Sequence, residues 1–458
     1  MSHRISRRHF LQSSGTRAAG IAAIVAGAPA IGLGAASEAN EKVVLALVGC
    51  GGRGSTLIRD FSARGDVAVA YLCDVDASRG NDLVGALKEK QGKAPEKVTD
   101  YRRALDDKSV TALVVATPDH WHALPTIHGC QAEKDVYVEK PASHNIWEGR
   151  KMVEAARRHK RVVQVGLQNR SAPFLFKAID YLREGKLGKV HLCKIYNLKS
   201  GGPFKAGADS KEPAGVDYDA WLGPAPKRPF NPGRFHGGWY YYWDFCGGDM
   251  GNDGIHQIDI ARWLVGMEYP RTVHASGGNL AFQDDREVPD TQVVTFEYDG
   301  AIMTFELTQW APYMDKIAGD VRQGDLFPYW PQCSTRIELY GTKGLMMVGR
   351  HGGGWQVFTS GKQMSRPGQV VAQEYGRIPD VPHKENFIQC IRSRKLPTGD
   401  IEEGHLSAIL AHLGNISYRV GCRKLTFDPK TERFVGDDAA NQLVKRTYRA
   451  PFVIPENV

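Results

Sequence analysis

The chain has 458 residues, 42% of them hydrophobic and 24% charged, a composition that excludes fibrous and disordered proteins. This length exceeds what one hydrophobic core usually organises, so we expect two domains. The formal net charge of +8 falls to +4 without the four arginines of residues 1–36. Because no run of Lys and Arg forms a basic surface, we expect no nucleic-acid partner.

The first 36 residues have the features of an export signal. Residues 6–11 read SRRHFL, the twin-arginine pattern, and residues 18–34 form a weakly apolar stretch rich in Ala and Gly. That stretch is too short and too rich in glycine for a stable membrane span. We therefore predict a twin-arginine signal over 1–36 and a periplasmic protein without an integral membrane anchor. A membrane anchor or a flexible N-terminus is the alternative, and the cleavage position stays open between Ala30 and Ala36.

Apolar runs alternate with helical stretches in the first half of the remaining chain. The predicted strands cover residues 43–48, 67–72, 110–116, 135–138 and 162–165, and helices are predicted over 55–64, 125–134 and 147–159. Runs that are apolar throughout are typical of strands buried on both faces of a parallel sheet. Strand alternating with helix predicts an α/β fold with a doubly wound parallel sheet, which we place over residues 43–165.

The pattern changes after residue 166. Strands with alternating burial are predicted over 190–196, 292–298, 301–307 and 336–340, with helices over 174–184, 383–394 and 401–420, and a long aromatic-rich loop over 199–248. Alternation indicates a sheet that is covered on one face only. We therefore predict an α+β domain with a largely antiparallel sheet over 166–458, which binds the substrate and forms oligomer contacts.

A glycine-rich turn follows the first predicted strand. Residues 49–54 read GCGGRG, fit G-x-G-x-x-G, and open a helix, which is the context that dinucleotide binding requires. Gly49 permits the tight turn, Gly51 lets the backbone approach a pyrophosphate, and Gly54 lets helix and strand pack closely. Gly52 and Arg53 complete the phosphate-binding turn, whose helix N-terminus offers free N–H groups. A purely structural glycine turn is the alternative.

An acidic residue stands at the end of the second predicted strand. Asp74, 20 positions after Gly54, is placed to accept hydrogen bonds from ribose hydroxyls and to repel a 2′-phosphate. The sequence thus favours NAD as the cofactor, with NADP as the alternative because Arg79 is near. A helix N-cap is the other interpretation of Asp74.

Two further motifs complete a family resemblance. With the glycine-rich turn, Glu139-Lys140-Pro141 and the segment GNDGIHQID over 251–259 resemble the Gfo/Idh/MocA family, which includes glucose–fructose oxidoreductase and inositol dehydrogenases. The likeness runs from about residue 43 to the C-terminus. It implies an NAD(P)-dependent oxidoreductase acting on a sugar or polyol, with a tightly bound cofactor. It further implies cofactor contacts from Thr117, His120, Glu139 and Gln168, and a substrate contact from Arg170.

The catalytic candidates are Lys140 and His256. Oxidation of a carbinol requires a group that holds or removes the hydroxyl proton, and both side chains are chemically suited to that task. The family usually has an Asp four residues before this His, where this chain has Asn252, which cannot accept a proton. Asp253 is the candidate replacement, and we expect the pKa of His256 to stay near 6.5 unless Asp253 or Asp259 lies beside it. A core His and a surface Lys are the alternatives.

Two further groups complete the predicted substrate side. His256 and Asp259 are spaced i, i+3 on a helix, so we place Asp259 in the substrate site with His256. The aromatic run over 239–243 begins with Trp239, which is suited to stack on a sugar ring or, alternatively, to plug the core. We predict no metal, because His120 and His122 lack a third ligand and the eight cysteines form no CxxC pair.

Three functions remain open at this point. The leading prediction is a sugar or polyol oxidoreductase, expected to be a homo-oligomer. The second is an NAD-dependent glycoside hydrolase that oxidises a ring hydroxyl, eliminates the glycoside and reduces the product again. The third is a sugar-binding protein without catalytic activity, against which the presence of both Lys140 and His256 argues.

Overall fold

The computed structural model describes residues 42–360 and 368–458, which belong to one compact unit, Lys42–Val458. The predicted signal over 1–36 lies outside the described residues. Within those residues, no helix is both long and apolar enough to cross a bilayer.

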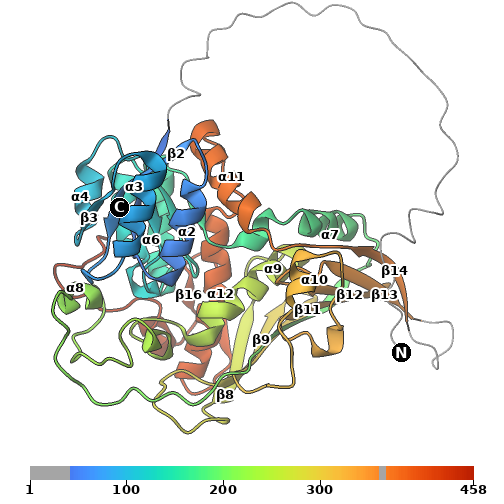
Figure 1. The fold of residues 1–458 in the computed structure, drawn as a ribbon. Coiled ribbons are helices and arrows are strands. Elements are labelled where there is room, and N and C mark those ends of the chain that lie inside the picture. The colour runs from blue at the N-terminus through green and yellow to red at the C-terminus, as the bar shows by residue number, and fades with distance from the viewer. Residues whose placement is uncertain (1–41, 361–367) are drawn as a thin grey trace, which may run out of the picture. The chain divides into compact units, whose positions relative to one another are not determined.

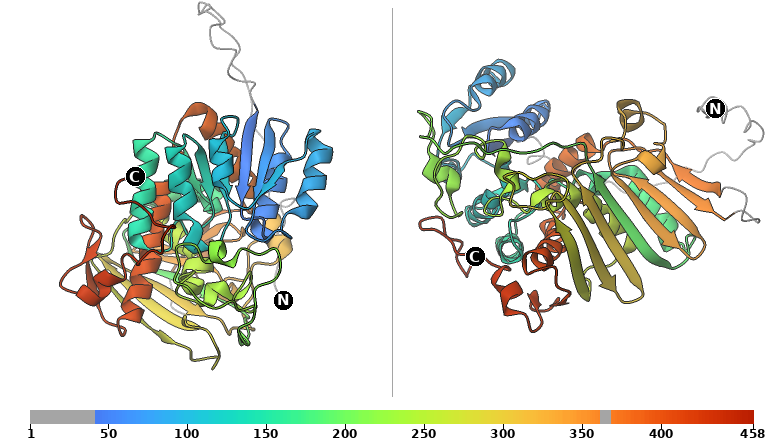
Figure 2. Two further views of the ribbon diagram at one scale, coloured as in Figure 1. Left: turned by 90° about the vertical axis from the view of Figure 1, so that its left-hand side faces the viewer. Right: turned by 90° about the horizontal axis from the view of Figure 1, so that it is seen from below.

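The N-terminal half forms a six-stranded parallel sheet. Its order is β3-β2-β1-β4-β5-β6, so the chain winds outward from β1 in one direction and continues from β4 in the other (Figures 1 and 2). The strands are β1 (Val43–Val48), β2 (Val67–Cys73), β3 (Glu96–Val98), β4 (Ala112–Val115), β5 (Asp135–Val138) and β6 (Val163–Val165). The helices are α2 (Gly52–Ser62), α3 (Asn81–Gln91), α4 (Arg102–Asp106), α5 (Ala123–Gln131) and α6 (Ile146–Arg158). This arrangement confirms the doubly wound sheet and places a ligand crevice at the carboxyl ends of β1 and β4.

The second half forms a ten-stranded sheet in the order β14-β13-β12-β11-β7-β10-β9-β8-β15-β16. Only β7 and β10 pair in parallel, which confirms a largely antiparallel sheet. Its strands are β7 (Val190–Leu198), β8 (Thr272–Gly278), β9 (Thr291–Tyr298), β10 (Ala301–Thr308), β11 (Arg336–Gly341), β12 (Gly344–Gly349), β13 (Trp355–Thr359), β14 (Gln369–Glu374), β15 (Leu425–Asp428) and β16 (Arg433–Phe434).

One face of this sheet packs on helices. The helices of this half are α7 (Pro173–Arg183), α8 (Tyr218–Leu222), α9 (Ile255–Val265), α10 (Gly319–Gln323), α11 (Asp380–Ser393), α12 (Ile401–Arg419) and α13 (Asp438–Gln442). Strands β7 and β8 contact α9 and α12, respectively (Figure 1). Phe296 and Phe305 are buried on this face, whereas Val293 and Ile302 are 45% and 44% exposed on the other. The alternation read from the sequence therefore marks a half-covered sheet.

Several elements depart from the sequence prediction. The sequence analysis placed no strand at β3, because three residues with two charged side chains carry no apolar run. It also ended the chain on the helix over 401–420, whereas β15, β16 and α13 follow. In addition, α11 packs Phe387 and Ile388 into the apolar cluster of β1 and β2, so this late helix completes the core of the first sheet.

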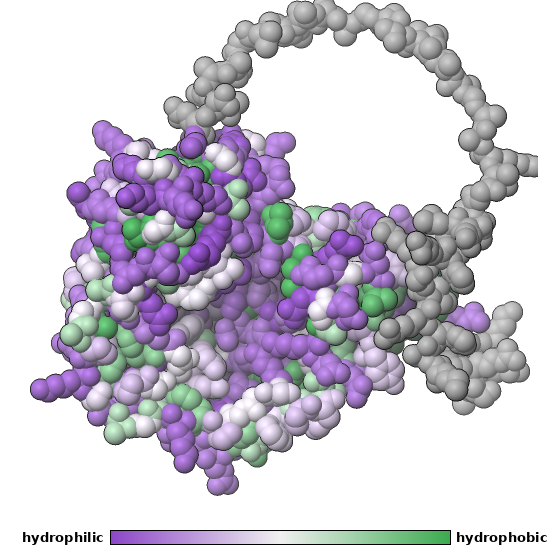
Figure 3. All heavy atoms as spheres, viewed as in Figure 1, coloured by the Kyte–Doolittle hydropathy of each residue, from purple (hydrophilic) through white to green (hydrophobic). Residues whose placement is uncertain are grey.

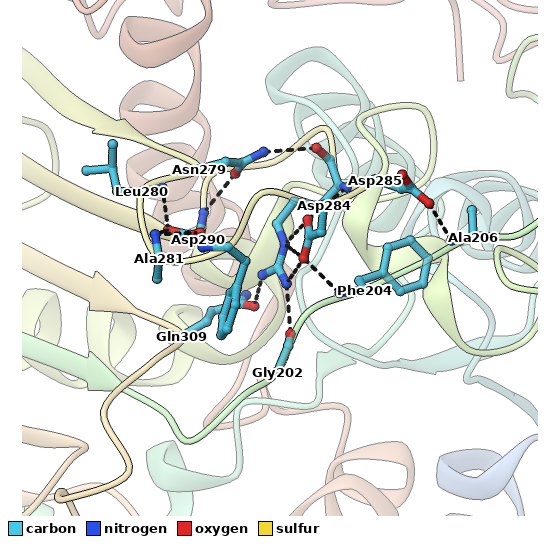
Figure 4. Close-up of polar contacts among 12 residues, drawn as sticks. Gly202, Phe204, Ala206, Asn279, Leu280, Ala281, Asp284, Asp285, Asp290 and Gln309 are labelled. Carbon is cyan, nitrogen blue, oxygen red and sulfur yellow. Dashed lines mark hydrogen bonds and ion pairs between the residues drawn. The ribbon is translucent and has the colours of Figure 1, made fainter.

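The loop over 199–248 is held by a second loop between β8 and β9. Asp290 accepts hydrogen bonds from the backbone N–H groups of residues 280–282 and so fixes the second loop on itself (Figure 4). The Phe204 N–H donates to Asp284, and the buried Arg286 donates to the carbonyl of Gly202. These bonds tie the long loop to the second sheet and thereby position the part of it that reaches the cavity described next.

Candidate active site

A cavity of about 730 Å³ opens at the carboxyl ends of the parallel strands. Figure 3 shows this face of the molecule hollowed, with hydrophilic side chains prominent in the recess. The first half contributes Gly49, Gly51, Gly52, Arg53, Asp74, Thr117, Glu139, Lys140, Gln168 and Asn169 to its wall. The second half contributes Trp239, Asn252, His256, Arg350 and His351. Both halves of the chain therefore build one site.

The glycine-rich turn has the geometry of a phosphate cradle. Gly49 has a φ of +94°, and a Cβ there would lie 2.7 Å from the Ala116 carbonyl oxygen. A Cβ on Gly54 would lie 1.9 Å from the Gly49 oxygen, so Gly54 serves helix packing and does not line the cavity. Gly51 and Gly52 instead face open space, and no side chain caps α2 at this end. The helix therefore presents unpaired N–H groups to a pyrophosphate in the cavity.

Asp74 holds the ribose end of the cavity. Its carboxylate accepts hydrogen bonds from the Cys50 N–H at 2.8 Å and from the Asp76 N–H at 3.0 Å, while still lining the wall. Burial raises the pKa of this carboxyl. Arg79 lines the same wall, and its nearest carboxylate is Asp76 at 3.8 Å. The residues thus fit NAD, whose ribose hydroxyls can donate to a carboxylate.

The remaining cofactor candidates divide between the wall and the interior. Glu139 forms an ion pair of 2.7 Å with Arg53, which joins the strand β5 terminus to the glycine-rich turn. The Thr117 hydroxyl is buried without a partner in the described structure, as expected of a group that awaits a ligand. The predicted cofactor contact of His120 is corrected. This side chain is 1% exposed behind the cavity wall, and its Nε2 forms a hydrogen bond with the Trp221 carbonyl. Trp121 lines the cavity in its place.

Lys140 and Asn252 meet in the cavity. Lys140 follows β5, and its Nζ donates to the Asn252 carbonyl oxygen at 2.5 Å and to Asn252 Oδ1 at 3.0 Å. Both acceptors are neutral oxygens of one residue. Asn252 therefore orients the Lys140 amine toward the cavity without placing a negative charge beside it.

His256 lies one helical turn after Asn252, where a π-helical turn over Met250–Gly254 leads into α9. The side chain lines the cavity, is 7% exposed, and has a buried Nδ1 without a partner in the described chain. Burial lowers its pKa well below 6.5, and the charges of Arg350 and Lys140 lower it further. The expectation of a pKa near 6.5 is therefore wrong, and the imidazole is neutral at physiological pH.

Asp253 does not replace the missing acid. Its carboxylate lies 2.6 Å from Arg350 and 2.9 Å from Lys199, and these cations hold its pKa well below the ordinary value. It is absent from the cavity wall. The candidate role as a proton acceptor is thus corrected, since an ion-paired, ionised carboxylate anchors Arg350 instead.

Arg170 and Asp259 form a buried ion pair away from the substrate. Their side chains are 3% and 1% exposed, and Arg170 Nη2 lies 2.8 Å from Asp259 Oδ1. Ser407 donates to the same carboxylate at 2.6 Å, and Glu403 contacts Arg170 at 2.9 Å. Neither partner lines the cavity, which corrects their assignment to the substrate. His256 and Asp259 are spaced i, i+3 on α9, but His256 lines the cavity whereas Asp259 is buried against Arg170.

The ion pair between Arg170 and Asp259 leads to a prediction about the stability of the protein. Replacing Asp259 by Ala leaves a buried guanidinium short of a carboxylate, so we expect the free energy of unfolding to fall by about 3 kcal/mol. Urea titration of the purified protein measures it. Asp82→Ala is the matched control, because the side chains of its ion pair with Arg59 are 66% and 48% exposed and the pair should contribute less than about 1 kcal/mol. An unchanged unfolding midpoint in Asp259→Ala, with lost activity, would return Asp259 to the substrate site.

The aromatic run lies partly at the cavity wall and partly in the core. Trp239 lines the cavity, whereas Tyr242 is 6% exposed within an aromatic cluster that includes Phe245. One residue of the run is therefore available to a ligand and another fills the core.

Sequence analysis missed Arg350 and His351, which follow β12 and reach the cavity from the second half. The His351 Nδ1 lies 3.2 Å from the Thr335 hydroxyl, and burial together with Arg350 lowers the pKa of His351 to about 2. In the sequence, the one feature that could have indicated them is an Arg-His pair directly before the glycine run over 352–354. Among the described residues, no cluster of three or more His, Cys, Asp or Glu is arranged to hold a metal.

Comparison with known proteins gives three family matches along the chain. Residues 43–167 match an oxidoreductase family with an NAD-binding Rossmann fold. Residues 224–347 match the GFO/IDH/MocA C-terminal domain, and residues 354–454 match an oxidoreductase-family C-terminal alpha/beta domain.

Individual relatives and structures agree with these matches. An uncharacterized oxidoreductase, YrbE, of Bacillus subtilis is 26% identical over 66% of this chain and 73% of its own length. Myo-inositol 2-dehydrogenase of Thermotoga maritima is 22% identical over 80% of this chain and 94% of its own. The structure of levoglucosan dehydrogenase in complex with NADH and levoglucosan aligns with a TM-score of 0.61 at 18% identity, covering 84% of this chain and 99% of that one. At that identity the structural likeness concerns the fold.

Proposed function

Because this chain belongs to the GFO/IDH/MocA oxidoreductase family, we propose that it uses NAD to oxidise or reduce a CH–OH group of a sugar or polyol. The observation that carries the proposal is the convergence of Lys140, Asn252 and His256 on the cavity that also contains the glycine-rich turn. Relatives named as inositol dehydrogenases and a structural neighbour named as levoglucosan dehydrogenase support the substrate class.

Different side chains bind the oxygen of the substrate hydroxyl and accept its proton. NAD, which the glycine-rich turn and Asp74 would hold, would supply the hydride acceptor for oxidation of the carbinol and the donor for the reverse reaction. Lys140, oriented by Asn252, donates a hydrogen bond that holds the hydroxyl oxygen. His256 is neutral at physiological pH and accepts the hydroxyl proton, as a general base must. Trp239 offers an aromatic face to the C–H surface of the sugar.

The predicted export signal leads to a proposal about the cofactor. We infer that the chain leaves the cytoplasm folded, by the twin-arginine route, with NAD already bound, because free NAD is scarce in the periplasm. The twin arginines Arg7 and Arg8 and the cradle at Gly51 and Gly52 support this inference. A second substrate would then return the cofactor to its starting state.

The first test concerns cofactor content. Protein purified from the periplasm should carry close to one NAD per chain, since Asp74 and the glycine-rich turn hold it and the compartment cannot resupply it. Denaturation followed by mass spectrometry of the supernatant measures this content. If neither NAD nor NADP is released and none binds on titration, the cofactor proposal fails.

The second test concerns the reaction. Incubating the protein with a panel of sugars, polyols and glycosides should reduce the bound cofactor, observed as nicotinamide absorbance, and give a carbonyl product. If bound NAD stays oxidised with every compound and no glycoside is cleaved, the oxidoreductase proposal fails and a sugar-binding protein without catalytic activity becomes the better interpretation.

A second candidate function rests on one group of relatives. A glycosyl hydrolase family 109 protein of Saccharopolyspora erythraea is 32% identical over 34% of this chain and 39% of its own length. An enzyme of this kind would release an alcohol from a glycoside without net reduction of NAD. Product analysis in the same panel separates the two functions, because a dehydrogenase yields a carbonyl product and a hydrolase yields free sugar.

We also propose a homo-oligomer. Leu280, Trp310 and Tyr313 are 72%, 50% and 69% exposed beside the uncovered face of the second sheet, and large exposed apolar groups mark interaction surfaces. Light scattering of the purified protein should give a mass that is a multiple of the chain mass. A monomer at micromolar concentration would contradict this proposal.

A further inference from the structure

At the substrate end of the cavity, Arg350 forms an ion pair with a carboxylate that also contacts two lysines. Arg350 lines the cavity, is 8% exposed, and lies 2.6 Å from Asp253 Oδ1. The other oxygen of Asp253 lies 2.9 Å from Lys199 Nζ and 3.6 Å from Lys316 Nζ. One carboxylate therefore serves three cations.

Only one further acid offsets this cluster. Asp249 pairs with Lys199, and its second oxygen accepts a hydrogen bond from Asn197. Within residues 42–360 and 368–458, no other carboxylate forms an ion pair with Arg350, Lys199 or Lys316. The two acids balance Arg350 and Lys199, and the third base, Lys316, is 49% exposed and does not line the cavity, so the cluster itself is close to neutral there.

Lys140 supplies a positive charge at the cavity that no ion pair offsets within the described residues. Its partners are the two neutral oxygens of Asn252, at the position where the family usually has an acid. Asp119 lines the same cavity but forms no ion pair with Lys140 in the described structure; burial raises the pKa of its carboxyl, and the charges of His122 and Lys140 partly oppose that rise. The substitution of Asn for Asp therefore leaves this end of the site one unit more positive than the usual pattern.

The positive charge of Arg350 also affects the pKa values of His256 and His351. Burial is the first cause that lowers the pKa of His256 and of His351, and the charge of Arg350 is the second for both. Both imidazoles are neutral as a result, so they add no charge of their own, and a bound anion would face Arg350 and Lys140 directly.

The cofactor does not account for this positive charge. Its phosphates have their own site at the N-terminus of α2, where Gly51 and Gly52 leave open space and Arg53 supplies a cation. Arg350 instead comes from the second half of the chain and is anchored by Asp253, the residue next to Asn252 in the sequence. The positive charge therefore belongs to the region of Lys140, Asn252 and His256.

We propose that the substrate is a sugar acid, whose carboxylate binds Arg350 while a hydroxyl of the same molecule reaches Lys140 and His256. This inference rests on the proposed oxidoreductase function and specifies its substrate class. A guanidinium held by Asp253 through Nη1 keeps further N–H groups for a carboxylate, and such charge-assisted hydrogen bonds are stronger than neutral ones. Because Asn252 and Asp253 are adjacent in the sequence, the two binding points lie within reach of a single small molecule.

The experiment compares matched substrates with the NAD-loaded protein. Glucuronate and glucose, galacturonate and galactose, and gluconate and sorbitol form three pairs that differ in the carboxylate, and glucose 6-phosphate tests a phosphate instead. We expect kcat/KM for the carboxylate member to exceed that of its neutral partner by about 10- to 100-fold, the range of a hydrogen bond to a charged group. A preference for the phosphate ester would overturn the assignment of a carboxylate.

Variants then locate the effect. Arg350→Met should lower the ratio of acidic to neutral substrate by about tenfold or more, mainly through KM, and Asn252→Asp should lower the same ratio by restoring the acid beside Lys140. Lys316→Met is the matched control, because Lys316 carries the same charge, contacts Asp253, and does not line the cavity; its ratio should change less than threefold. A ratio measured within one preparation does not depend on the fraction of protein that folds.

The outcomes separate this inference from the proposed function. If neutral sugars are oxidised as well as their acids, the sugar-acid inference is wrong while the oxidoreductase stands. If Arg350→Met weakens binding of NAD and leaves the substrate ratio unchanged, Arg350 serves the cofactor and the inference is also wrong. If no compound of any pair reduces bound NAD, the proposed function itself has failed.

Discussion

Replacing Lys140 by Ala should lower the rate of hydride transfer by a factor between about 100 and 10,000, the usual contribution of a positioned proton-transfer group. The amine contacts Asn252 and lines the cavity, and no other described lysine shares that wall. Its removal takes away the donor that holds the substrate hydroxyl. Cofactor binding should persist, because the glycine-rich turn and Asp74 are untouched.

Single-turnover absorbance of the nicotinamide measures the rate, and titration with NAD measures binding separately. Lys134→Ala is the matched control: this lysine is buried, and its Nζ donates to the Asp107 carbonyl outside the cavity. We expect the control to retain the wild-type rate. A Lys140→Ala protein with an unchanged single-turnover rate would make Lys140 an ordinary loop residue.

Replacing His256 by Asn should abolish the acid limb of the pH–rate profile for oxidation and lower the rate by about 100-fold or more. Oxidation requires the neutral imidazole as base. Because burial, Arg350 and Lys140 lower its pKa, the neutral form persists as the pH falls through 6.5. The wild-type rate should therefore stay level across the ordinary histidine range and decline only at lower pH. Asn keeps much of the shape but cannot take up the proton.

Profiles of kcat/KM against pH for wild type, His256→Asn and Arg350→Met test the assignment. Arg350→Met removes a positive charge that disfavours the imidazolium, so its acid limb should move to higher pH. Loss of the limb in one variant and its displacement in the other identify His256 as the titrating base. If the His256→Asn profile keeps the wild-type shape, the base lies elsewhere, with Lys140 the next candidate.

The sequence by itself was sufficient for the parallel sheet and the cofactor cradle. Strands such as β1 and β4 are apolar throughout, and the glycine-rich turn needs its residues at fixed spacing within one strand–turn–helix unit. Lys140 was found because Glu139-Lys140-Pro141 resembles a family motif and stands directly after a predicted strand. These features depend on contiguous residues, so a pattern along the chain contains the required information.

The electrostatics of the site depended on the tertiary structure alone. Asp253 and Asp259 look alike in sequence beside His256, yet one anchors Arg350 and the other is buried against Arg170. Arg350 lies about 100 residues after Asp253 in the sequence, and no sequence motif marks it as part of the site. Since a pKa depends on burial and on charges that are near in space, the low pKa of His256 could not be read from spacing. Helical periodicity tells which residues are neighbours on one helix, whereas packing between distant segments decides which charge each of them meets.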